Sequence, residues 1–255
     1  MTKSFQMGYS KVSLLLCFFF FAIGCTKNKC EEVIDQVYVY PEEAAFGKPF
    51  DEQIKMFKIP EQTLHCLSTD ALIKSCLDYP KMSLIWTMSD LQAGFDKVYA
   101  MCNGFGELWG RGDKFQKLFY LYKQLDFNRD WQTYTDLENG MYIDNIIRHE
   151  LIIAQYEILN DLTAPEKIEL FQLALDNQKK KYELAHQIWG IAGMMTTCAI
   201  LSRIMYLDKY QPLIEEYNNN ELMLLNVAYI LILDSDVVNK TMSLSEDYLK
   251  ILKNK

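Results

Sequence analysis

The chain contains little glycine and proline and few histidines: 11 Gly, 6 Pro and 3 His in 255 residues. An all-β domain of this size needs many turns, and turns depend heavily on glycine and proline. Their scarcity therefore argues against an all-β fold and favours long helices with short connections. Half of the residues are hydrophobic, so the chain has enough apolar surface for a sizeable buried core.

The chain also lacks an excess of positive charge. It has 26 Lys and Arg against 34 Asp and Glu, and its formal net charge is −8. Nucleic acids are bound by clusters of basic residues, so we expect no nucleic-acid partner. An acidic chain is also repelled by an anionic membrane surface, so attachment to a membrane would need a lipid.

Residues 1–24 have the pattern of a bacterial signal peptide. Lys3 and Lys11 precede an apolar stretch that runs from Val12 to Gly24. This stretch is shorter than the ~20 apolar residues that a membrane-spanning helix requires. A short apolar stretch behind basic residues is typical of an export signal, with a buried core helix as the alternative.

The residues Ala22-Ile23-Gly24-Cys25 resemble the lipobox of bacterial lipoproteins. The resemblance implies cleavage before Cys25 and attachment of a lipid to its thiol, so Cys25 is the predicted lipid-attachment residue. Ala22 stands where leucine is usual, which leaves plain secretory cleavage as the alternative. Thr26 replaces the Asp associated with inner-membrane retention, so we expect a lipid-anchored protein of the outer membrane, on its periplasmic or its surface side.

Seven cysteines are present, of which Cys17 lies in the predicted signal and Cys25 carries the predicted lipid. The other five are Cys30, Cys66, Cys76, Cys102 and Cys198. An odd number at irregular spacing is not typical of a disulfide framework. We therefore expect buried free thiols that pack as small hydrophobic residues, with a Cys66–Cys76 bridge as the alternative.

Helix signals recur from residue 59 onward. Ser68, Asp113 and Asp136 are predicted to begin helices, Tyr79-Pro80 to end one, and Asn103-Gly104-Phe105-Gly106 to mark a break. Thr163 and Glu166 form the pattern of a capping box. The apolar run over residues 188–207 contains Thr196, Thr197 and Arg203, which favours a central helix of a soluble bundle over a membrane span.

These signals predict an all-α fold, either a multi-helix bundle or a solenoid-like array of helical pairs. Residues 25–58 are expected to form a lipidated tether and an irregular segment, and residues 59–255 a single helical domain. No repeat period is strong enough to choose between a bundle and an array.

Two partial metal motifs are incomplete. His149-Glu150 is half of the HExxH pattern of zinc proteases, but position 153 is Ile instead of the second His. Glu183 and His186 have the spacing of one di-iron ligand pair, and the chain has no second pair. We therefore expect no metal, no cofactor and no catalytic residues, and an exposed or capped position for His149.

Two further groups were considered as sites. Glu107 and Arg111 lie near a glycine-rich stretch that lacks the residues of a phosphate-binding loop, so an ion pair is expected. Trp109, Trp131 and Tyr134 are mostly expected in the core, and a groove that binds a carbohydrate or a peptide is the alternative.

Part of the chain resembles a group of uncharacterised lipoprotein-like helical proteins of the bacterial envelope. The resemblance is carried by Ile59-Pro60, Leu64, Ser68-Thr69-Asp70-Ala71-Leu72, Cys76, Tyr79-Pro80, Gly94-Phe95, Asn103-Gly104-Phe105, Glu107-Leu108, Arg111 and Asp113. It covers about a quarter of the chain and implies a secreted helical domain without implying an activity.

The sequence thus predicts a lipid-anchored binding or scaffolding module of the cell envelope with an envelope protein as its partner. One alternative is an envelope hydrolase whose site is assembled from distant residues such as Glu107, Arg111, His149 and Glu150. Another is a structural subunit of an envelope complex, which would expose a large apolar patch.

Overall fold

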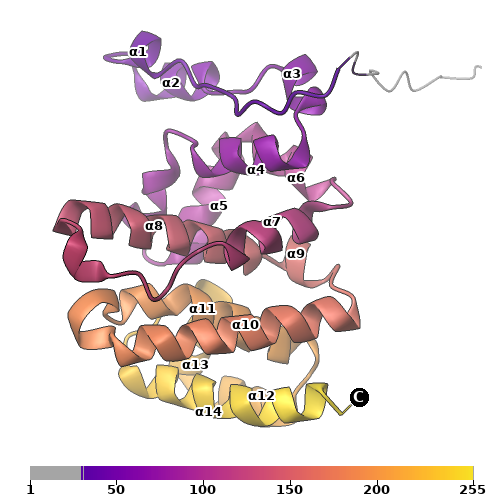
Figure 1. Ribbon diagram of the computed structural model, residues 1–255, viewed down its shortest axis with the longest axis vertical. Coiled ribbons are helices and arrows are strands. Elements are labelled where there is room, and N and C mark those ends of the chain that lie inside the picture. Colours follow the sequence, from indigo (N-terminus) through magenta and orange to yellow (C-terminus); the bar gives the residue numbers. More distant parts are fainter. Residues whose placement is uncertain (1–29, 31, 255) are drawn as a thin grey trace, which may run out of the picture.

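The computed structural model describes residue 30 and residues 32–254 (Figure 1). The predicted signal peptide and Cys25 lie outside these residues. In the part of the chain that is described, every regular element is a helix, apart from an isolated bridge between Ile34 and Leu67. The all-α prediction is confirmed.

The first half of the chain forms mostly short helices. They are α1 (Glu42–Ala45), α2 (Phe50–Met56), α3 (Glu61–Cys66), α4 (Thr69–Leu77), the 3-10 helix η1 (Met82–Thr87), α5 (Leu91–Met101), α6 (Asn103–Trp109) and α7 (Lys114–Lys123).

The second half contains the longest helices. Its elements are η2 (Trp131–Thr133), α8 (Asp136–Ile153), α9 (Tyr156–Leu159), α10 (Ala164–Glu183), the π-helix η3 (Ala185–Trp189), η4 (Ala192–Met194), α11 (Met195–Leu207), α12 (Gln211–Asn219), α13 (Glu221–Leu224), the π-helix η5 (Leu225–Tyr229) and α14 (Ser235–Leu252).

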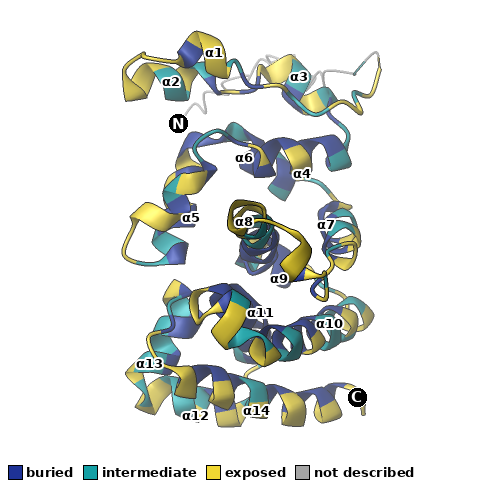
Figure 2. Ribbon diagram, turned by 60° about the vertical axis from the view of Figure 1, so that its left-hand side comes forward, coloured by how far each residue is buried: buried dark blue, intermediate teal, exposed yellow. Residues whose placement is uncertain are grey.

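The helices are stacked in layers along the long axis of the molecule (Figure 1). Helices α1–α3 lie at one end, α4–α7 form the next layer, α8 crosses the middle, and α10–α14 form the other end. Helix α4 packs on α6 and α7, α7 packs on α8, α8 packs on α11, and α11 also contacts α10 and α14. Each layer buries its apolar side chains against the next layer (Figure 2), which is the arrangement of a stacked array.

Several helix boundaries follow local sequence signals. The hydroxyl of Ser68 accepts a hydrogen bond from the Ala71 amide at the start of α4. The amide of Thr163 donates to Glu166 Oε2 at 2.9 Å, which confirms the capping box at the start of α10. Helix α8 begins at Asp136 as predicted, although the side chain of Thr135 caps it. Such caps act because they satisfy amides that have no partner within the helix.

Two local predictions were wrong. Asp113 precedes α7 but does not cap it, because its carboxylate accepts a hydrogen bond from Thr69 on α4 instead. Residues 103–106 form the first turn of α6, and Gly104 serves close packing: a Cβ there would lie 2.8 Å from Cys76 Sγ. Within the N-terminal segment the structure adds two short helices, α1 and α2, each preceded by a proline and with acidic residues in its first turn.

Helix α11 is the buried centre of the C-terminal layers. Residues 195–205 are all buried, as predicted for a central helix. Its one charged side chain, Arg203, is 1% exposed and donates to the carbonyls of Ala154 (2.9 Å), Val227 (2.8 Å) and Ala228 (3.0 Å). None of the helices in the described residues has the length and apolar character that crossing a membrane requires.

Candidate functional site

A disulfide fastens the N-terminal segment to the domain. Cys30 is bonded to Cys66 at the end of α3, with a Cα–Cα distance of 5.4 Å. The expectation that both are free thiols was wrong, and so was the alternative Cys66–Cys76 bridge. The pairing joins residues 36 positions apart, which spacing alone does not reveal. Cys76, Cys102 and Cys198 are buried and free, as predicted.

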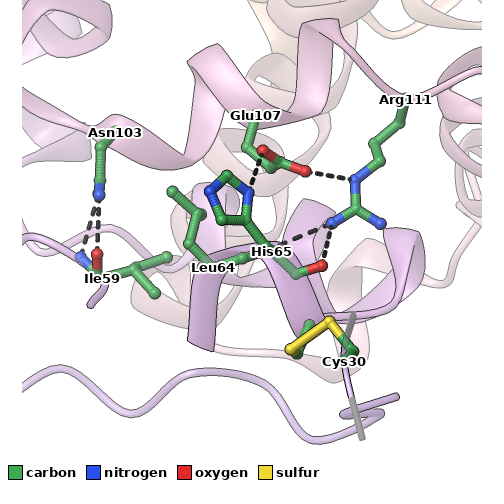
Figure 3. Close-up of polar contacts among 8 residues, drawn as sticks. Cys30, Ile59, Leu64, His65, Asn103, Glu107 and Arg111 are labelled. Atoms are coloured by element: carbon green, nitrogen blue, oxygen red, sulfur yellow. Dashed lines mark hydrogen bonds and ion pairs between the residues drawn. A yellow bond between two sulfur atoms is a disulfide. The ribbon is translucent and has the colours of Figure 1, made fainter. Parts of the chain in front are cut away.

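A polar cluster lies beside this disulfide, between α3 and α6 (Figure 3). Glu107 accepts from Arg111 Nε at 2.9 Å and contacts His65 Nδ1 at 2.9 Å. Arg111 also donates to the carbonyls of His65 (3.2 Å) and Leu64 (3.4 Å). The predicted Glu107–Arg111 ion pair is therefore present. Arg111 also satisfies free carbonyls at the end of α3, where the helix dipole favours a positive charge.

The start of α6 is tied to the segment before α3 by a second polar contact (Figure 3). The Asn103 side chain accepts from the Ile59 amide at 3.0 Å and donates to the Ile59 carbonyl at 2.8 Å. These contacts hold α3 on α6 from both ends. The Glu107 carboxylate and the Arg111 guanidinium therefore take part in holding α3 against α6.

A second polar cluster is completely buried between α8, α10 and α11. Glu150 and Lys181 are both fully buried and 2.5 Å apart. The Glu150 carboxylate also accepts from the hydroxyls of Tyr122 (2.9 Å), Thr196 (2.6 Å) and Thr197 (2.8 Å). Lys181 further donates to the Gly193 carbonyl and to Thr197. Every lone pair direction of the carboxylate is thus supplied with a donor, as a buried charge requires.

Burial changes the ionisation of groups in and beside this cluster. It lowers the pKa of Lys181, and the Glu150 charge opposes that change. Burial raises the pKa of Tyr122, reinforced by the same carboxylate. His149 is buried and not exposed, with Nδ1 2.8 Å from the Asn145 carbonyl, and burial lowers its pKa below the usual value.

The residues of the hydrolase alternative do not converge. The polar contacts of Glu107 and Arg111 are with α3, whereas those of Glu150 are with Tyr122, α10 and α11. Glu183 and His186 are exposed at the end of α10 and beyond it. In the residues that the structure describes, no group of three or more His, Cys, Asp or Glu side chains is placed to hold a metal ion.

The three aromatic residues predicted as core or groove separate into two places. Trp109 packs against Phe95, Tyr99 and Phe105 on α5 and α6. Trp131 is buried and its ring lies 5.3 Å from that of Trp189. Tyr134, in contrast, is 47% exposed, so only the region around Trp131 and Tyr134 offers a surface.

That surface continues along the first half of α8, which is exposed whereas its second half is buried (Figure 2). Leu137 and Met141 are 74% and 65% exposed and lie four residues apart, on one face of the helix. We call Tyr134, Leu137 and Met141 the α8 surface. A recess of about 370 Å³ adjoins it, lined by Arg129, Tyr134, Glu138, Met141, Tyr142 and Asn145.

Arg129 gives this recess a polar group. Its guanidinium carbon lies 3.6 Å from the ring centre of Tyr134 and 4.3 Å from that of Tyr142. Its Nε atom is buried and has no hydrogen-bond partner among the described residues. The recess therefore combines apolar side chains with a guanidinium group, the composition of a binding surface. The sequence analysis identified Tyr134 but missed Arg129, Leu137 and Met141. The only signal for the last two was their spacing, four residues apart at the start of a polar helix.

Two comparisons with known proteins complete this description. No protein-family model matches the chain. No solved structure matches it either, so the assignment of a function depends on the residues described above.

Proposed function

We propose that this protein is a lipid-anchored binding module of the bacterial cell envelope and that the α8 surface binds an envelope protein. The observation that carries the proposal is the contrast within α8. Its second half buries its apolar residues, while its first half exposes Leu137 and Met141 to solvent beside an aromatic recess. Apolar side chains grouped in this way are typical of protein-binding surfaces.

The chemistry of the recess indicates what the partner presents. A partner would cover Leu137 and Met141 with an apolar side chain and offer an oxygen acceptor to the Arg129 guanidinium, which lines the recess. Tyrosine, methionine and arginine are enriched at protein interfaces because they combine large contact area with polar groups. The same composition does not suit a nucleic acid, because Arg129 is the only cation among the described residues that line the recess.

The proposed anchor would set the position of the domain. Five residue steps separate Cys25 from Cys30, which is fixed to α3 by its disulfide. Such a length spans at most about 18 Å when fully extended. A lipid on Cys25 would therefore keep the end of α3 within about this distance of the membrane.

The anchor is tested by fractionating cells that produce the full-length protein. We expect the wild-type protein in the membrane fraction, carrying labelled fatty acid, and the Cys25→Ala variant without label and released by mild washing. A wild-type protein that is soluble and unlabelled would overturn the anchor without bearing on the α8 surface.

The binding surface is tested by photo-cross-linking in living cells. A photoreactive amino acid is placed at Met141 or, as a control, at Leu233, which is 63% exposed in another part of the molecule. We expect one envelope protein to be captured from position 141 alone. The capture should be lost in the background Leu137→Gln, which keeps a good helix-forming residue, and in Arg129→Gln. Equal capture from both positions, or capture that survives both substitutions, would refute the proposal.

A further inference from the structure

Two of the free thiols lie together in the core. Cys76 is on α4, and Cys102 lies between α5 and α6. A Cβ added at Gly104 would be 2.8 Å from Cys76 Sγ and 3.5 Å from Cys102 Sγ. The bare Cα of this glycine thus makes room for both sulfur atoms, which lie beside the same position of α6. The third free cysteine, Cys198, belongs to a different part of the core, near Lys181 and Glu150.

The two thiols have unequal surroundings. The neighbouring Cys76 thiol and the amides of Gly104 and Phe105 lower the pKa of Cys102 against the effect of its burial. Burial raises the pKa of Cys76. A thiolate is the attacking form in thiol–disulfide exchange, so Cys102 is suited to react first and Cys76 to react second.

The N-terminal segment covers this pair. We call residues 32–58 the strap. Tyr40 of the strap is 7% exposed, donates its hydroxyl hydrogen bond to the Ser75 carbonyl at 3.0 Å, and lies against Cys102. The Tyr38 amide donates to Ser75 Oγ at 2.9 Å. The strap is fastened at its start by the Cys30–Cys66 disulfide.

We propose that Cys76 and Cys102 are a redox-active thiol pair that closes into a second disulfide, and that the strap, fastened by Cys30–Cys66, limits access to it. The oxidant is a molecule that carries a disulfide. The Cys102 thiolate attacks one sulfur of that disulfide, forms a mixed disulfide and releases one thiolate. Cys76 then gives its proton to this thiolate, attacks the Cys102 sulfur and releases the second thiolate, which takes up the Cys102 proton. Two protein thiols are oxidised and one disulfide is reduced to two thiols.

The chemistry is tested in the mature chain with Cys30–Cys66 intact, using oxidised glutathione as the probe. Mass spectrometry of digested protein should find a Cys76–Cys102 linkage and leave Cys198 as a free thiol. In Cys76→Ser, glutathione should remain attached to Cys102, whereas in Cys102→Ser the Cys76 thiol should stay unmodified. Separate glutathione adducts on both cysteines without a linkage, or no reaction in mild urea that opens the strap, would overturn the proposal.

The control of access is tested by comparing rates of linkage. The variant Cys30→Ser/Cys66→Ser should form the Cys76–Cys102 disulfide about tenfold faster or more, because a buried thiol reacts through local opening of its cover. Circular dichroism verifies that the variant keeps its helices. If it does not fold, mild selective reduction of Cys30–Cys66 in the wild-type protein provides the same comparison. Equal rates with and without the Cys30–Cys66 disulfide would refute the role of the strap.

Discussion

Replacing Lys181 by methionine removes the positive charge beside the Glu150 carboxylate while keeping a side chain of similar length. Both groups are fully buried and 2.5 Å apart. In Lys181→Met the carboxylate keeps three hydroxyl donors, from Tyr122, Thr196 and Thr197. It loses the one charged partner that it has among the described residues, in a medium where an unpaired charge is strongly disfavoured.

The expected cost follows from these contacts. Removing one member of a buried ion pair destabilises a protein by about 3–5 kcal/mol. The three remaining hydroxyl donors place this variant near the lower limit, at about 3 kcal/mol. Glu150→Gln should also destabilise the protein. The double variant should lose less free energy of unfolding than the sum of the two single variants, because it leaves no unpaired charge in the core.

The measurement is urea unfolding at pH 7 followed by far-ultraviolet circular dichroism, from which the free energy of unfolding is obtained. Lys180→Met is the matched control, since Lys180 precedes Lys181 on the same helix and is half-exposed. We expect this control within about 0.5 kcal/mol of wild type. A loss below about 1 kcal/mol for Lys181→Met, or strictly additive costs, would refute the view that the pair is held together by mutual charge compensation in the core.

Three further changes test other parts of the structure. Arg203→Met should destabilise the protein by about 3 kcal/mol or more in the same urea assay, because two buried carbonyls and one partly buried carbonyl lose their donor; a loss within error would contradict this. Gly94→Ala should cost about 1–3 kcal/mol, since its Cβ would lie 2.2 Å from the carbonyl oxygen of Ile85. Gly106→Ala, with open space around the new methyl group, should be neutral or stabilising, and equal effects at the two glycines would refute the close-approach argument. His149 has a lowered pKa in the folded state, so stability should fall as the pH drops below about 6.5, where the unfolded chain binds a proton that the folded chain does not. His149→Phe should flatten this part of the profile and the exposed His186→Gln should not; the reverse outcome would exclude His149 as its source.

The parts of the fold that were predicted correctly depend on neighbours in the sequence. The Ser68 cap and the Thr163–Glu166 capping box involve residues three positions apart. Their hydrogen bonds therefore form within a short segment and need no tertiary contact. The central helix α11 follows from a long apolar run with few charges, because such a run is stable only when it is surrounded by protein or lipid.

The errors arose where distant residues compete for the same group. Asp113 has a suitable position for capping α7, but the Thr69 hydroxyl on α4 takes its carboxylate. Residues 103–106 contain two glycines, which in isolation indicate a turn. In the folded chain these residues form the first turn of α6, and position 104 needs glycine because a Cβ there would lie 2.8 Å from Cys76 Sγ.

The sequence by itself determined the helical class, the positions of most helices and the incompleteness of the metal motifs, because these depend on composition, on periodicity and on spacings of a few residues. Only the tertiary structure decided that Cys30 pairs with Cys66, that Glu150 faces Lys181 and that Cys76 meets Cys102. Each of these contacts joins residues more than twenty positions apart. Which of many such residues meet depends on how the layers pack, and that packing reflects the burial of the whole set of apolar side chains together.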